Sequence, residues 1–155
     1  MTYQRPRDTY FETQVLTATP QKLRLMLIDG ALTYARQAAE HWRQGRLYEG
    51  GEAVLGCQRI VTELLHGLKP DVAPQLVGNV ASLYNFVFRA LIEAGLKHDT
   101  ARLNDAVTVL EIERETWRQV CEQLGSSFTP TQAPAPHRRQ LRPGVSASGG
   151  FSLDA

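Results

Sequence analysis

The strongest constraint on the fold is a long helical stretch, residues 19–42, whose apolar stripe is too wide for one packing contact. Thr19 suits an N-cap and Pro20 suits the first helical position, where no backbone donor is needed. Apolar residues then recur every three to four positions, which predicts an amphipathic helix that needs neighbours on more than one side. The stripe comprises Leu23, Met26, Leu27, Gly30, Ala31, Tyr34, Ala35, Ala38 and Trp42, and it is widened by Leu25, Ile28 and Leu32.

Three further amphipathic segments follow this helix. We expect Gly45 to end the first helix and further helices over 52–68 and 74–94, the latter closed by Gly95. A fourth helix is expected to begin at Asp99 or Thr100 and to end at Gly125. Four helices joined by short turns predict an all-α fold, an antiparallel up-down four-helix bundle over residues 19–125.

The two flanks of this bundle differ from it in composition. Residues 1–18 are expected to form an N-terminal arm that is polar at first, where Pro6 argues against a helix. Residues 126–155 are rich in Pro, Ser and Gly and are expected to be disordered. The arm later becomes apolar and could act as a hydrophobic staple or cover a groove. Its large apolar residues are Tyr10, Phe11, Val15 and Leu16.

The residue types argue against catalysis and against nucleic-acid binding. A net charge of +1 gives no strong field for nucleic acid. Glu63 and His66 form a Glu-x-x-His pair without a second copy, so a di-metal site is not expected, and no catalytic triad or phosphate loop is recognisable. We therefore expect no enzyme activity, no metal and no cofactor.

The same sequence favours a cytosolic protein. Cys57 and Cys121 fit apolar helix faces and are expected to be free thiols, which agrees with a reducing compartment. No apolar run is long enough to cross a bilayer, and the N-terminus lacks the apolar region of a secretory signal. The surplus of apolar residues over 74–94 suggests a second packing face or a groove for an amphipathic or disordered partner.

Several motifs resemble the FliS family of flagellar secretion chaperones. Residues 15–20 (VLTATP) match the family's V-x-T-A-S-P, and residues 25–31 (LMLIDGA) match its L-M-L-Y-D-G-A. Departures are Gln14 where the family often has Asn, Ile28 where it usually has Tyr, and Gly95 where it often has Asn. The resemblance spans about 10–124 and further includes Tyr10, residues 60–64, Asn79, Val80, Leu83, Tyr84, Arg89, residues 91–94, Asp99, Arg114 and Trp117.

The resemblance implies a cytosolic chaperone that binds the disordered C-terminal region of flagellin, prevents its early polymerisation and assists its export. The resemblance also suggests an export-gate component and other flagellar regulators as partners. The chain is expected to be a monomer or a weak homodimer. Each groove position below also suits the core, the commoner place for such residues. The expected partner-binding residues are Tyr10, Val15 and Leu16 in the arm, and Leu55, Val61, Leu65, Val77, Val80, Tyr84 and Val87 in the bundle.

Two alternatives remain open at this point. One is a helical adaptor that homodimerises through the surface of residues 74–94 and has no secretion client. The other is a metal enzyme, which metal analysis of the purified protein would decide.

Overall fold

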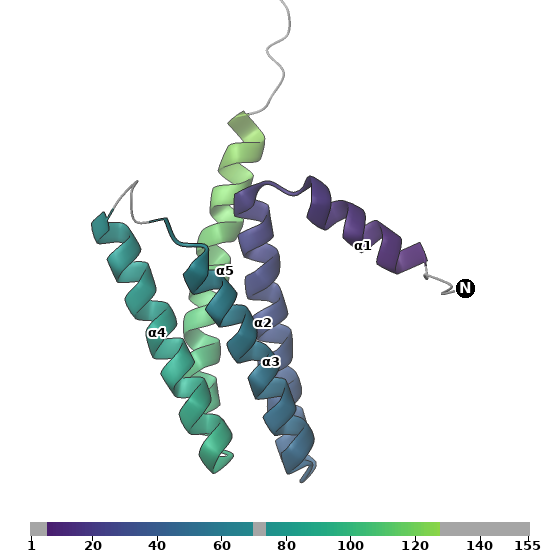
Figure 1. The fold of residues 1–155 in the computed structure, drawn as a ribbon, viewed down its shortest axis with the longest axis vertical. Helices are drawn as coiled ribbons and strands as arrows, with labels where there is room; N and C mark the ends of the chain where they lie inside the picture. The colour runs from purple at the N-terminus through teal and green to yellow at the C-terminus, as the bar shows by residue number, and fades with distance from the viewer. Residues whose placement is uncertain (1–5, 70–73, 128–155) are drawn as a thin grey trace, which may run out of the picture.

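The computed structural model describes residues 6–69 and 74–127, and every regular element in these ranges is a helix (Figure 1). The all-α prediction is therefore confirmed. Residues 1–5 of the predicted arm and residues 128–155 of the predicted disordered tail lie outside the described residues, whereas Ser126 and Ser127 of that tail belong to a helix. The helices are α1 (Pro6–Thr17), α2 (Pro20–Arg43), α3 (Leu47–His66), α4 (Pro74–Lys97) and α5 (Thr100–Ser127).

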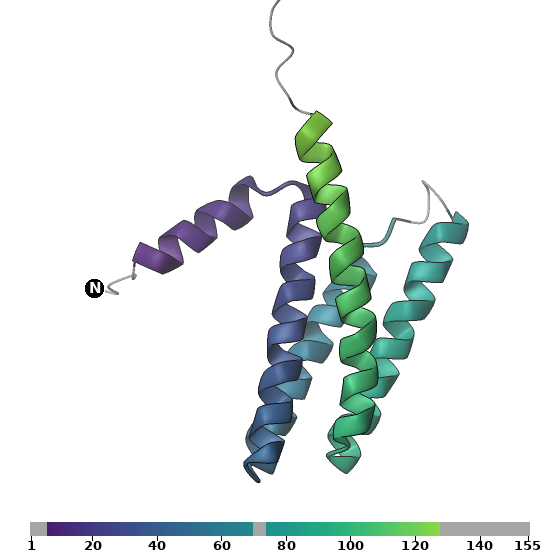
Figure 2. The same ribbon diagram turned by 180° about the vertical axis from the view of Figure 1, so that it is seen from behind.

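Four of these helices pack side by side in a ring. Helix α2 contacts α3 and α5, and α4 contacts the same two helices. Consecutive helices of this group run in opposite directions in the two ribbon views (Figures 1 and 2). Helix α1 projects away from them, although it leads directly into the start of α2.

The ends of α2 are those that the sequence predicts. The Thr19 hydroxyl accepts a hydrogen bond from the Lys22 amide at 3.2 Å, and Pro20 occupies the first turn. At the other end Gly45 has a φ of 74°. The Arg46 amide donates to the His41 carbonyl at 2.8 Å, which closes the helix with a left-handed glycine cap.

The end of α4 corrects the prediction for Gly95. The helix continues through this glycine to Lys97, and His98 takes the left-handed position with a φ of 50°. Gly95 instead faces α3, where an added Cβ would lie 3.4 Å from Val54. Asp99 caps α5, because its carboxylate accepts from the Arg102 amide at 3.1 Å.

Helix α3 begins at Leu47, five residues before the expected start, although Gly50 and Gly51 weaken its first turns. Packing explains the difference, because Gly50 lies against the ring of Trp42 and Gly56 against the ring of Tyr34. These glycines let α2 and α3 approach closely. Helices α3 and α5 end at His66 and Ser127, within two residues of the predicted ends.

Helix α1 is a second correction. Pro6 starts this helix instead of preventing one, for the reason that also applies to Pro20: the first helical position needs no backbone donor. Residues Pro6–Thr17 of the arm therefore form a helix, and its largest apolar side chains are exposed. Tyr10 is 67% exposed and Leu16 is 85% exposed.

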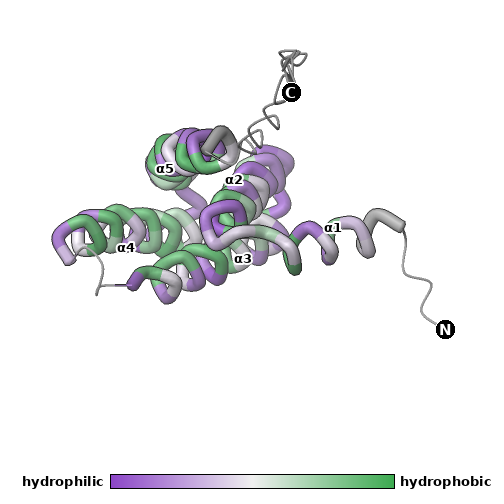
Figure 3. Tube along the Cα trace, turned by 90° about the horizontal axis from the view of Figure 1, so that it is seen from above, coloured by the Kyte–Doolittle hydropathy of each residue, from purple (hydrophilic) through white to green (hydrophobic). Residues whose placement is uncertain are grey.

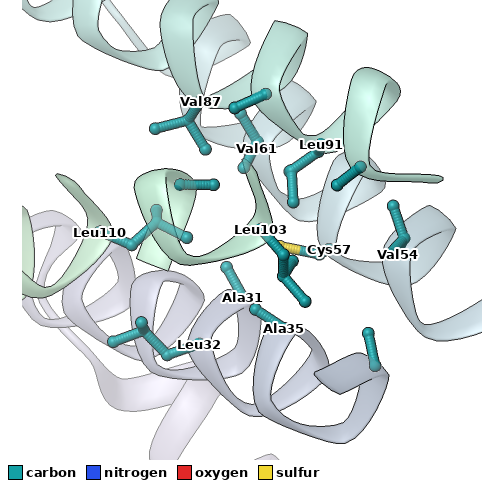
Figure 4. Packing of buried hydrophobic residues seen from close by; sticks show 14 of the residues in the cluster. Ala31, Leu32, Ala35, Val54, Cys57, Val61, Val87, Leu91, Leu103 and Leu110 are labelled. Atoms are coloured by element: carbon teal, nitrogen blue, oxygen red, sulfur yellow. The ribbon is translucent and has the colours of Figure 1, made fainter. Parts of the chain in front are cut away.

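The core lies between α2, α3, α4 and α5 (Figure 4). Val61 and Val87 point into it from α3 and α4, and Leu103 and Leu110 enter from α5. Arg114 of α5 occupies a position where the apolar stripe is interrupted. Its side chain pairs with the carboxylate of Asp29 of α2.

Candidate partner-binding site

The ten residues predicted to bind a partner fall into three structural groups. Val61, Tyr84 and Val87 have no exposed surface and belong to the core. A partner cannot touch them in this arrangement, and contact at these positions stays a prediction that would require the helices to separate. The periodicity placed them correctly on apolar faces but could not distinguish the inner part of a face from its edge.

The second group lies at the edges of the core. Leu65 and Val80 are half-buried and pack against core residues, and Val77 is half-buried near the start of α4. These residues show part of their surface to solvent. The third group is exposed and consists of Tyr10 and Leu16 of α1, with the half-buried Val15 beside them, and Leu55 of α3.

A groove of about 520 Å³ opens where α2 begins and α3 ends, and we call it the open-end groove. Helix α5 contributes Trp117 to its lining. None of the ten predicted residues lines it, so sequence reasoning missed this groove. Its apolar lining also includes Pro20, Leu23, Leu27, Leu64 and Leu68.

The sequence did contain a signal for the open-end groove. Pro20 marks the start of α2 and Gly67 follows the end of α3, so both helix ends were predictable. Leu23 lies on the predicted inner stripe yet is 38% exposed, because α3 stops before it covers that turn. The groove results from unequal helix ends, which a face-by-face pattern does not report.

Arg24 adds a cation to the open-end groove. Its Nη2 donates to the Leu64 carbonyl at 3.2 Å, and its guanidinium carbon lies 5.3 Å and 5.2 Å from the ring centroids of Tyr84 and Trp117. Beneath it, the Tyr84 hydroxyl donates to the buried carboxylate of Glu113 at 3.0 Å. Burial raises the pKa of Tyr84 above its ordinary value, so the phenol keeps the proton that it donates.

A second depression, of about 470 Å³, lies at the opposite end of α3, and we call it the α3–α4 groove. Leu55 from the predicted set lines it. Tyr48 is 76% exposed and Leu96 is 78% exposed at its edge. In Figure 3 much of α4 is coloured as hydrophobic.

The described residues contain no cluster of three or more His, Cys, Asp or Glu side chains that could hold a metal. Burial raises the pKa of the Cys57 thiol to about 12, which makes it a poor nucleophile. No helix in ranges 6–69 and 74–127 is long and apolar enough to cross a membrane. The arrangement offers apolar contact surface with one oriented cation.

Comparison with known proteins gives the same family as the motifs. The sequence profile of the family described as "Flagellar protein FliS" matches residues 3–124. The chain is 30% identical over 122 residues to the "Flagellar secretion chaperone FliS" of Bacillus subtilis, which covers 79% of this chain and 90% of that protein. It is 29% identical over 110 residues to the protein of the same description from Salmonella typhimurium, which covers 70% of this chain and 82% of that one.

A solved structure supports the fold. The "Crystal structure of flagellar chaperone from bacteria" superimposes with a TM-score of 0.64 at 20% identity and covers 76% of this chain and 99% of that chain. Nearly the whole solved protein is thus matched by residues of this one. The sequence match, the relatives and the described helices agree, and the chain belongs to the FliS family of flagellar secretion chaperones, which are not enzymes.

Proposed function

We propose that this chain binds the disordered C-terminal region of flagellin in the cytosol, keeps it from polymerising early and assists its export. The observation that carries the proposal is the apolar surface that the folded chain leaves open at two grooves and along α1. Large exposed apolar patches mark interaction sites in soluble proteins. The names of the relatives identify flagellar secretion as the process.

The two grooves suit a partner that is not folded alone. A disordered segment loses conformational entropy when it binds, so its affinity must come from several apolar anchors. An antiparallel up-down bundle, as the sequence predicts, provides a rigid frame for anchors at both of its ends. Leu55 would contact the segment in the α3–α4 groove, with Leu65, Val77 and Val80 contributing from the exposed edges of α3 and α4.

Helix α1 supports a role beside the open-end groove. It joins α2 at Pro20, which itself lines this groove. A 12-residue helix without packing partners is marginal in water, so α1 gains stability when its apolar side meets a bundle groove or a bound segment. Tyr10, Val15 and Leu16 are the residues that would make this contact.

Isothermal titration with the C-terminal segment of flagellin tests the proposal. Leu55→Glu should weaken binding by about 10-fold or more, since it removes an apolar anchor and places a charge in the α3–α4 groove. Ile112→Glu is the matched control, because Ile112 is 61% exposed on α5 and lines neither groove. No binding by the unmodified chain, or equal losses in both variants, would refute the proposal.

A self-associating adaptor is the second candidate function, favoured by exposed apolar residues on α4. Leu76 is 64% exposed, and Leu83 and Phe86 are each about two-fifths exposed. An adaptor of this kind would show concentration-dependent dimers in sedimentation experiments and no heat with the flagellin segment. The chaperone would bind the segment at concentrations where it is monomeric.

A further inference from the structure

Arg24 brings a positive charge into the lining of the open-end groove, which is rich in leucine and also holds Glu63 and Lys69. Among the described residues, no carboxylate lies within ion-pair distance of Arg24, whereas Arg36 and Arg114 each pair with one carboxylate and Arg102 pairs with two. The Nε atom of Arg24 is buried and has no hydrogen-bond acceptor among residues 6–69 and 74–127. A partly buried guanidinium without an anion is costly, so an apolar guest alone would leave that cost in place.

The guanidinium is also held in a fixed orientation. The rings of Tyr84 and Trp117 flank it, and the Leu64 carbonyl binds Nη2. Gly67 places no side chain beside Nη1, whereas a Cβ at this position would lie 3.6 Å from that atom. A stacked, oriented arginine is a prepared donor for a carboxylate, which accepts its hydrogen bonds more strongly than a neutral group does.

We propose that the open-end groove selects an Asp or Glu side chain on the flagellin segment, and that Arg24 binds its carboxylate. The flanking residues of the segment would be apolar and would fill the positions beside Leu23, Leu27 and Leu68. This inference rests on the proposed function and adds the chemistry that one groove recognises. Arg24 then acts as a specificity-determining residue inside an apolar contact.

The test is a double-mutant cycle between the chaperone and the flagellin C-terminal segment. Each Asp and Glu of the segment is replaced in turn by Asn or Gln and titrated against the unmodified chain and against Arg24→Gln. One replacement should weaken binding to the unmodified chain by about 10-fold or more, and the same replacement should change binding to Arg24→Gln by less than about 3-fold. Lys22→Gln is the matched control, since Lys22 is an exposed cation on the same helix that lines neither groove, and it should preserve the full effect.

Circular dichroism decides whether Arg24→Gln is folded, because Arg24 also binds the end of α3. If that variant is unfolded, Arg24→Lys takes its place. It keeps the charge but loses the planar fork, and the sensitive replacement should then cost clearly less than with the unmodified chain.

The outcomes separate this inference from the proposed function. Tight binding in which no acidic replacement is coupled to Arg24 overturns the carboxylate assignment and leaves the proposed function standing. Amidation of the segment's terminal carboxylate is tested in the same cycle. If amidation is the one change that is coupled to Arg24, the assignment to a side chain is also overturned. Absence of any binding by the unmodified segment overturns the proposed function, and the inference with it.

Discussion

Alanine substitutions at the adjacent glycines Gly50 and Gly51 of α3 should change the stability of the protein in opposite directions. A Cβ at Gly50 would lie 2.2 Å from Trp42 Nε1 and 2.3 Å from Trp42 Cδ1, both closer than real side-chain contacts. A Cβ at Gly51 would have no neighbour within 4 Å. Gly50→Ala should therefore destabilise the protein, and Gly51→Ala should stabilise it.

The magnitudes follow from two opposing effects. Alanine in place of a helical glycine gains up to about 1 kcal/mol, and less near the start of a helix such as α3. Overpacking a buried site costs about 1–3 kcal/mol, and the Trp42 ring is a rigid, 8% exposed neighbour that cannot move aside easily. The net expectation is a loss of about 2 kcal/mol for Gly50→Ala and a gain of about 0.5 kcal/mol for Gly51→Ala.

Urea unfolding and thermal melting, each followed by circular dichroism, measure both variants under one set of conditions. The melting temperature should fall by about 8 °C for Gly50→Ala and rise by about 2 °C for Gly51→Ala, as for a domain of roughly 100 residues. The urea m-value should stay constant, since the exposed surface on unfolding is nearly unchanged. Shifts of the same sign and size would refute the close α2–α3 contact at Gly50.

Three further predictions use single sites. Tyr10→Ala should weaken binding of the flagellin segment but leave the melting temperature within about 1 °C, because Tyr10 is exposed on α1. Arg118 lowers the pKa of the exposed Glu115 to about 2, so the small stabilisation by this pair is present above about pH 4.3 and is lost as pH falls toward 2. In Arg118→Gln, the pKa of Glu115 measured by NMR titration should rise toward its ordinary value, although Gln119 and Arg114 still lower it. Iodoacetamide at pH 8 should label the partly exposed Cys121 first and Cys57 only after unfolding.

Most helix ends could be predicted from the sequence, whereas the role of one glycine could not. Thr19, Pro20 and Gly45 act through local chemistry, namely a cap, a missing donor and a left-handed turn, and such signals are complete within a few residues. In its local sequence Gly95 resembles Gly45, which does end a helix. It serves contact with α3 instead, and only the packed structure distinguishes a glycine that ends a helix from one that admits a neighbour.

The candidate site was less predictable than the fold, because its residues depend on helices from different parts of the chain. Arg24 lies outside the apolar stripe predicted for residues 19–42, and nothing in its neighbours in the sequence marks it. Its role depends on Tyr84 and Trp117, which lie 60 or more positions away in the sequence. No spacing within a single helix could bring these three residues together.

Helical periodicity predicts faces, whereas the grooves of this protein lie at helix ends. In a ring of four helices each helix packs against two neighbours. A wide apolar face is therefore buried in the core along most of the length of the helix. Val61 and Leu65 show the transition, since they are one turn apart on α3 and only the second reaches the edge. Open apolar surface then remains where one helix outlasts its neighbour. The binding residues should therefore be sought by comparing where adjacent helices begin and end.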